Sequence, residues 1–180
     1  MSPVRTAARF LLATHGLGPE LEDHLEAIID AGFSHRAEPG ESICAEGDLS
    51  RDVYFLLEGS IQVRMRDYLG IEQDLAQLHA PTMFGHMGVI DGSPRSATCL
   101  ALTDVRINLL DRETYRGLVE DPGPRGDMIR RLLLAAMNRQ LTAGNQALQR
   151  LLALGDDQQP DHKKLSRISG TLEGWERDEG

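Results

Sequence analysis

The sequence has few cysteines, a deficit of positive charge and no long hydrophobic run. Its two cysteines, Cys44 and Cys99, each lie in an apolar, strand-like segment, without a CxxC neighbour or a metal-ligand spacing to a histidine. We therefore expect two buried, reduced thiols. The N-terminal apolar run, Phe10 to Ala13, is far shorter than the roughly 18 residues that a membrane span needs, and no signal-peptide cleavage pattern follows it. These absences favour a cytoplasmic chain without a membrane segment.

Basic residues are outnumbered by acidic ones. The 19 Lys and Arg residues against 28 Asp and Glu residues give a formal net charge of −9. Such a chain repels polyanions, which argues against general binding to nucleic acid or to anionic membranes. Any phosphate-binding site must therefore be local.

No set of residues with the spacing of a catalytic or metal site stands out. Most of the histidines are scattered, without a short-range metal spacing or a nucleophile motif beside them. They are His15, His24, His35, His79 and His162. We accordingly expect a protein that is not an enzyme and that carries no metal or cofactor.

The pattern of apolar and turn-forming residues divides the 180 residues into four parts. Two short helical patterns come first, and short apolar segments alternating with Gly-rich and Asp-rich turns follow. A long helix then opens at Pro124, where proline suits the first turn, and a polar segment without a sustained period ends the chain. The four parts are residues 1–31, 32–122, 123–154 and 155–180.

Apolar residues recur along the long helix at alternating steps of three and four. They are Leu134, Met137, Leu141, Gly144, Leu148 and Leu151. This spacing is typical of a two-helix coiled seam and so of a homodimer, but an amphipathic helix that packs on the β-rich body has a similar stripe. The last part of the chain holds the one tryptophan, Trp175, which is either an anchor for a protein partner or an incidental exposed ring.

The segment Phe84 to Thr98, FGHMGVIDGSPRSAT, has the composition of an anion-binding loop. Gly85 and Gly88 allow the backbone to turn closely around a ligand, and a short helical turn with an Asp–Gly–Ser–Pro exit turn fits between them and Arg95. We expect Arg95 to enter a strand among small and apolar residues. A charge there suggests a paired anion, unless the strand end is exposed to solvent.

Two further blocks precede this loop, and together the three resemble the cyclic nucleotide-binding domain family over roughly residues 20–152. The resemblance implies an α+β, mainly β fold: an eight-stranded antiparallel β-roll of the jelly-roll type, with N-terminal helices and a long C-terminal helix. The first block comprises Gly40, Glu41, Ile43, Glu46, Gly47 and Asp48. The second comprises Val53, Tyr54, Phe55, Leu56, Leu57, Glu58, Gly59, Ile61 and Val63.

The resemblance also implies a ligand, cyclic AMP or cyclic GMP, and the residues that bind it. Backbone groups of the Gly85–Met87 segment and the side chains of Arg95 and Ser96 would contact the cyclic phosphate. The base would be met by the long helix, where Asn138, Thr142 and Asn145 are polar and Thr142 is the predicted contact. The predicted binding residues are Phe84, Gly85, His86, Met87, Gly88, Arg95, Ser96 and Thr142.

His86 departs from the family pattern, because nucleotide-binding members usually carry a glutamate there that bonds the ribose 2′-hydroxyl. A histidine can still donate to or accept from a hydroxyl, but losing a charge-assisted bond costs roughly 1.5 to 3 kcal/mol, about ten- to a hundredfold in affinity. A protonated His86 beside a phosphate would in turn strengthen binding near and below a pH of about 6.5.

Two functions fit these features. The first is a stand-alone cyclic nucleotide sensor that dimerises and signals through a protein partner. The second is a β-roll that has lost nucleotide binding and acts as an interaction or assembly scaffold, as His86 and Trp175 suggest. Family members that regulate transcription append a helix-turn-helix domain, whereas residues 155–180 show no paired helical pattern. We therefore expect no direct DNA binding.

Overall fold

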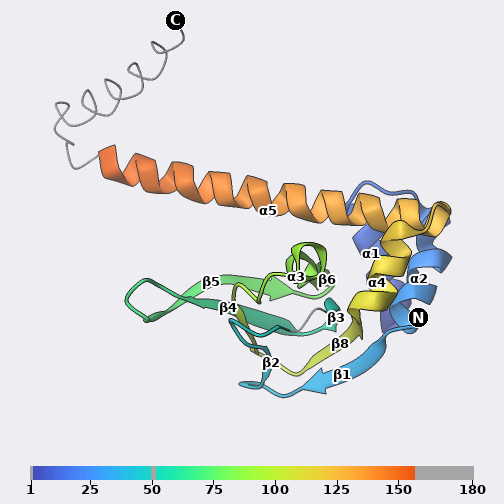
Figure 1. Ribbon diagram of the computed structural model, residues 1–180, viewed down its shortest axis with the longest axis horizontal. Coiled ribbons are helices and arrows are strands. Elements are labelled where there is room, and N and C mark those ends of the chain that lie inside the picture. Colours follow the sequence, from blue (N-terminus) through green and yellow to red (C-terminus); the bar gives the residue numbers. More distant parts are fainter. Residues whose placement is uncertain (1, 50–51, 157–180) are drawn as a thin grey trace, which may run out of the picture. The chain divides into compact units, whose positions relative to one another are not determined.

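The computed structural model describes residues 2–49 and 52–156 (Figure 1). The described helices are α1 (Pro3–Thr14), the 3-10 turn η1 (Pro19–Leu21), α2 (Glu22–Asp30), α3 (His86–Asp91), α4 (Arg112–Glu120) and α5 (Pro124–Asp156). The described strands are β1 (Phe33–Ala37), β2 (Ser42–Cys44), β3 (Val53–Glu58), β4 (Ser60–Arg66), β5 (Glu72–His79), β6 (Thr82–Phe84), β7 (Thr98–Ala101) and β8 (Val105–Leu110). Among these residues, no helix combines the length and the apolar character needed to cross a membrane. Trp175 and the predicted polar segment from residue 157 onward lie outside the described residues.

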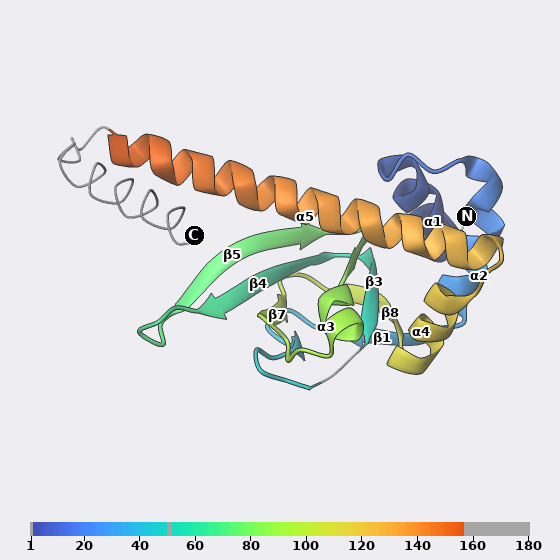
Figure 2. The same ribbon diagram turned by 45° about the horizontal axis from the view of Figure 1, so that its top comes forward.

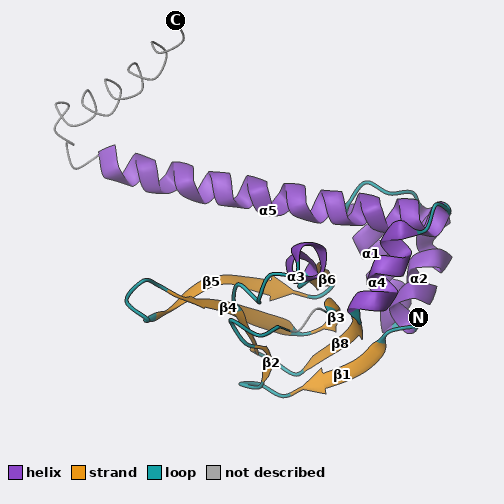
Figure 3. Cartoon of the chain, viewed as in Figure 1, coloured by secondary structure: helices purple, strands orange, loops and turns teal. Residues whose placement is uncertain are grey.

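The eight described strands form two four-stranded sheets, which Figure 3 distinguishes from the helices. One sheet has the strand order β1-β8-β3-β6 and the other has the order β2-β7-β4-β5. Every described pairing is antiparallel. The predicted eight-stranded antiparallel β-roll, with helices before it and a long helix after it, is thereby confirmed.

Strand β3 is buried on both faces because two cores meet there. Successive side chains of a strand point to opposite faces. Val53, Phe55 and Leu57 therefore join the core under the helices, whereas Tyr54 and Leu56 join the core shared by the two sheets. This arrangement explains why the predicted VYFLL segment is almost continuously apolar rather than alternating. It also points the Tyr54 side chain into the core that the two sheets share.

The helices α1, α2 and α4 gather at one end of the roll (Figure 2). The first part of α5 joins the same core, where Met128, Ile129 and Leu132 are at most 1 % exposed. The chain divides into two compact units at Ala136 and Met137, so the remainder of α5 is described separately.

Two roles were expected for the apolar stripe of α5: pairing with a second helix, or packing on the body of the protein. Different residues of the helix fit the two roles. Packing on the body of the protein is made by side chains outside the predicted seam, such as Ile129 and Leu132. The seam residues Leu134 and Leu141 stay 65 % and 66 % exposed. The side chains of Leu148 and Leu151 lie outside the described residues. One helix thus packs on its own chain and still carries exposed leucines at the spacing of a second seam.

Candidate functional site

The loop between β6 and β7 is shaped by two glycines with positive φ. Gly85 has φ +79° directly before α3, and Gly92 has φ +72° directly after it. The exit turn is closed by Asp91, whose Oδ1 accepts hydrogen bonds from the Ser93 N–H at 2.9 Å and the Ser93 hydroxyl at 2.6 Å. The predicted helical turn and Asp–Gly–Ser–Pro exit turn are both present.

Arg95 is a buried cation that the protein itself satisfies. Its side chain belongs to a residue only 6 % exposed. Its Nη1 donates to the Gly85 carbonyl at 2.6 Å, and its Nη2 donates to the Asp52 carbonyl at 2.7 Å. The side chain is buried as expected, and these two partners are backbone carbonyls; the paired anion that the sequence suggests stays a prediction.

The predicted strand position of Arg95 is wrong, because β7 begins only at Thr98. The Arg95 N–H donates to the Asp48 carbonyl at 2.9 Å, and the Arg95 carbonyl accepts from the Gly47 N–H at 2.8 Å. These bonds tie Arg95 to a turn before the sheet pairing of β7 starts.

An aromatic pair completes the surroundings of the guanidinium. The Arg95 Cζ lies 5.0 Å from the centre of the Tyr54 ring, within cation–π range. Tyr54 in turn stacks on Phe84, with ring centres 4.9 Å apart, because the two residues are direct partners in the β3–β6 pairing. The three sequence blocks thus converge on Arg95: the first through Gly47 and Asp48, the second through Tyr54, and the third through Gly85.

Asp52 and Tyr54 are site residues that sequence reasoning missed. Burial raises the pKa of the Asp52 carboxyl, the charge of Arg95 acts to lower it, and Asp111 acts to raise it. The proximity of Asp52 to Arg95 could not be read from the chain, since 43 residues separate them. The packing of Tyr54 could be predicted in part. Because Tyr54 and Phe55 point to opposite faces of a strand that is apolar on both, each ring must pack against other residues of the protein.

His86, the first residue of α3, is buried without a partner. It is 6 % exposed, and neither ring nitrogen has a hydrogen-bond partner among the described residues. Burial lowers the pKa of its imidazole below the ordinary value. The ring is therefore neutral at pH 7, with one donor and one acceptor unused.

The remaining predicted site residues differ in exposure. Phe84 and Gly88 are buried, Met87 is 40 % exposed, and Ser96 is exposed beside the buried Arg95. Thr142 is exposed on the part of α5 that belongs to the second unit, and its contact with a base stays a prediction.

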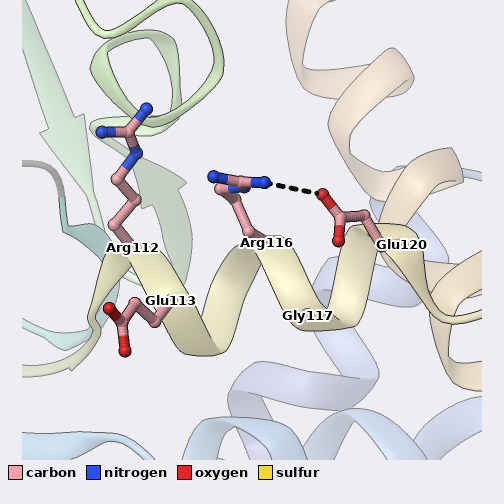
Figure 4. A pocket seen from close by; sticks show the side chains of 5 residues that line it. All are labelled: Arg112, Glu113, Arg116, Gly117 and Glu120. Carbon is pink, nitrogen blue, oxygen red and sulfur yellow. Dashed lines mark hydrogen bonds and ion pairs between the residues drawn. The ribbon is translucent and has the colours of Figure 1, made fainter.

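A shallow hollow of about 330 Å³ lies on the surface of α4, away from the predicted binding residues in sequence (Figure 4). It surrounds the ion pair between Arg116 and Glu120, whose N···O distance is 3.0 Å. Both side chains are more than half exposed, so this pair is a solvated feature of the helix surface. The lining residues are Arg112, Glu113, Arg116, Gly117 and Glu120. Residues 2–49 and 52–156 contain no group of three His, Cys, Asp or Glu side chains placed to hold a metal ion.

The buried His86 predicts how stability depends on pH. The unfolded chain takes up a proton on this imidazole near pH 6.5, whereas the folded chain, with a lowered pKa, does so only at lower pH. Between the two pKa values the unfolded state binds more protons, so stability falls as the pH falls, by up to about 1.4 kcal/mol per pH unit.

Urea unfolding of wild type and His86→Gln at pH 7.5, 6.5 and 5.5 measures this effect. We expect wild type to lose more stability than His86→Gln on acidification, because Gln does not titrate. Parallel losses in the two proteins would show that His86 is not buried as a neutral ring.

The geometry described so far defines a class of protein: a β-roll whose β6–β7 loop encloses a buried arginine at the meeting point of three chain segments. Residues 34–121 match the family described as the cyclic nucleotide-binding domain. These residues belong to that family.

Individual relatives agree with this assignment. The chain is similar to the cyclic AMP receptor protein of Thermus thermophilus, with 34 % identity over 125 residues, covering 69 % of this chain and 51 % of the relative. It is also similar to the cAMP-dependent protein kinase type II regulatory subunit of Drosophila melanogaster, with 31 % identity over 105 residues, covering 58 % of this chain and 27 % of the relative. The chain thus spans about half the length, or less, of the curated relatives it matches.

Solved structures give the same result. The catabolite activator protein of Thermus thermophilus superposes with a TM-score of 0.65 and 28 % identity, covering 83 % of this chain and 63 % of that one. The N-terminal domain of a transcriptional regulator from Streptomyces coelicolor superposes with a TM-score of 0.57 and 26 % identity, covering 82 % of this chain and 95 % of that domain.

Proposed function

We propose that this chain is a cyclic nucleotide sensor that binds a nucleoside cyclic monophosphate, such as cyclic AMP, at Arg95 and passes the signal to a protein partner. The observation that carries the proposal is the buried Arg95 guanidinium, held where three segments meet. Relatives that are named for cyclic AMP and for regulation support a regulatory rather than a catalytic role.

A cyclic phosphate suits Arg95 better than its present partners do. The guanidinium now donates to two neutral carbonyls, those of Gly85 and Asp52. A phosphodiester offers charged oxygens, and a guanidinium can pair with them in a bidentate bond between opposite charges, which neutral carbonyls do not provide. The ligand can therefore draw one or both bonds away from the carbonyls. Because the chain has a net charge of −9, this attraction is local to the site.

In this proposal, His86 binds the ribose of the nucleotide. The imidazole has two unused polar atoms in a buried position, and such groups gain free energy from any partner that reaches them. A ribose hydroxyl is both donor and acceptor, so it matches a neutral ring. The bond lacks the charge of a glutamate, which sets affinity about ten- to a hundredfold below that of a glutamate-bearing site.

The sensing step follows from the bonds that the ligand replaces. Arg95 holds Gly85, at the start of α3, and Asp52, directly before β3. When Arg95 turns to a phosphate, both segments lose a buried donor and must find another or move. Ligand binding is thereby coupled to the position of α3 and of the chain entering β3.

Homodimerisation through α5 is part of the proposal. It is supported by Leu134 and Leu141, two large apolar side chains that are exposed at a seven-residue spacing on one helix. Sedimentation equilibrium of the wild-type chain tests it. A species of twice the chain mass is expected, and a monomer at every accessible concentration would overturn this part of the proposal.

Isothermal calorimetry with cyclic AMP and cyclic GMP tests the proposed function, with 5′-AMP as a noncyclic control of higher charge. We expect at least one cyclic nucleotide to bind more tightly than 5′-AMP. The lowered pKa of the buried His86 argues against the stronger binding at low pH that the sequence suggested. If neither cyclic nucleotide gives heat at millimolar concentration, the proposal that the chain is a cyclic nucleotide sensor is overturned. Binding by His86→Glu alone would instead support the scaffold alternative, in which the site has degenerated.

A further inference from the structure

The only two cysteines of the chain face each other across a pair of strands. Cys44 in β2 and Cys99 in β7 are direct partners in the antiparallel β2–β7 pairing. Both thiols are free and buried, at 7 % and 6 % exposure, as the sequence predicted. Their position opposite one another was not predicted.

The strand pairing brings the two residues to a spacing that suits a disulfide, next to an irregularity in register between Ser42 and Cys44. Directly opposed residues of antiparallel strands have Cα atoms about 4.5 or 5.5 Å apart and side chains on the same face. A disulfide requires a Cα separation of about 4.4 to 6.8 Å. The bond can therefore form between Cys44 and Cys99 without a change in strand pairing.

The two thiols are chemically unequal. The adjacent Cys99 side chain lowers the pKa of Cys44 to about 7, against the effect of burial, and the charge of Arg95 acts in the same direction as Cys99. The pKa of Cys99 is raised, by the neighbouring Cys44 and by burial. At a given pH, Cys44 thus has the larger thiolate fraction of the two.

We propose that Cys44 and Cys99 form a redox modification site, which a peroxide oxidises to an intramolecular disulfide. The Cys44 thiolate attacks one peroxide oxygen, the O–O bond breaks, and the leaving hydroxide takes up a proton to become water. The Cys44 sulfenic acid is then attacked by the Cys99 sulfur, which forms the S–S bond and releases a second water. Two thiols and one hydrogen peroxide give one disulfide and two waters.

The bridge would join two segments that lead directly to Arg95. Gly47, three residues after Cys44, donates its N–H to the Arg95 carbonyl at 2.8 Å. Thr98, next to Cys99, accepts from the Glu46 N–H through its hydroxyl at 3.0 Å. A disulfide would add a covalent link to these hydrogen bonds. The site itself does not depend on nucleotide binding, so its test is independent of the proposed function.

The test treats the native full-length chain with hydrogen peroxide and removes the excess with catalase. The chain is then unfolded and exposed to iodoacetamide, and its intact mass is measured. We expect the loss of two hydrogen atoms and no added alkyl group, with both thiols recovered after dithiothreitol. We also expect the oxidised chain to melt about 5 to 10 °C higher, because the bridge closes a long loop. A chain that still takes up two alkyl groups, or one that links only to a second chain, would overturn the proposal.

Single variants separate the two roles. In Cys99→Ser, the Cys44 sulfenic acid has no resolving thiol, so peroxide should give a product that dimedone traps. In Cys44→Ser, burial still raises the pKa of Cys99, whereas in Cys99→Ser the charge of Arg95 still acts to lower that of Cys44, so dimedone labelling should be slower in Cys44→Ser at pH 7. Equal labelling of the two variants would contradict the assigned order of attack.

Discussion

Replacing Arg95 by alanine should weaken the binding of a cyclic nucleotide by about a hundredfold or more. A hydrogen bond to a charged group is worth about 1.5 to 3 kcal/mol, and the phosphate would lose both the bond and the charge that localises it in a chain of net charge −9. Calorimetry of wild type and Arg95→Ala with cyclic AMP measures the ratio. A loss of less than about threefold would show that Arg95 is not the phosphate ligand.

Arg66→Ala is the matched control for this experiment. It removes the same charge from β4, where the Arg66 side chain is 66 % exposed, and should leave affinity nearly unchanged. Arg95→Lys keeps the charge but not the planar set of donors, so an intermediate affinity is expected. Arg95→Ala also leaves the Gly85 and Asp52 carbonyls without their donor, at about 1 to 3 kcal/mol of stability. The titrations therefore belong at a temperature where circular dichroism shows both chains folded.

Local features of the site could be predicted because their causes are local. Gly85 and Gly92 bracket α3 since only glycine adopts their positive φ without strain, and Asp91 closes the turn on its own neighbour Ser93. The burial of Arg95 could also be inferred, from the apolar residues that follow it. These inferences needed no knowledge of which strand lies beside which.

Features that depend on strand pairing could not be predicted. One partner of Arg95 is the carbonyl of Asp52, 43 residues away, and nothing in the sequence near either residue marks the pair. Cys44 and Cys99 face each other only because β2 pairs with β7 across an irregularity in register that begins after Ser42. A shift of one residue would place the two thiols on opposite faces. Each cysteine alone is typical of a buried apolar residue.

The start of β7 shows how a turn can override an alternating pattern. Arg95 and Cys99 are buried and Ser96 is exposed, as the alternation of a strand predicts, although Ala97 and Thr98 are both half-buried. The hydrogen bonds of Arg95 nevertheless go to the Gly47–Asp48 turn, so sheet pairing starts at Thr98. Alternation reports which side is buried, not which segment supplies the backbone partner.

Replacing Gly85 by alanine should damage the loop more than the same change at Gly92. Gly85 has φ +79°, and an added Cβ would lie 2.8 Å from the Arg95 Nη1 and 2.8 Å from the Tyr54 Cδ2. The backbone strain costs about 1 kcal/mol, and crowding in a packed site adds about 1 to 3 kcal/mol. We expect urea unfolding to show a loss of about 2 to 4 kcal/mol.

Gly92→Ala separates the crowding from the strain. Gly92 has φ +72° at the other end of α3, but the nearest atom to its added Cβ is the Arg112 Nη2, at 3.9 Å. It should therefore lose only the roughly 1 kcal/mol of strain. In Gly85→Ala, the crowded Arg95 guanidinium must also turn away from residue 85, so nucleotide binding should weaken at least about tenfold. In Gly92→Ala, the affinity should stay within about threefold of wild type. Equal stability losses would mean that the close packing of Gly85, Tyr54 and Arg95 is not what holds the site, because the two glycines differ in little besides that contact.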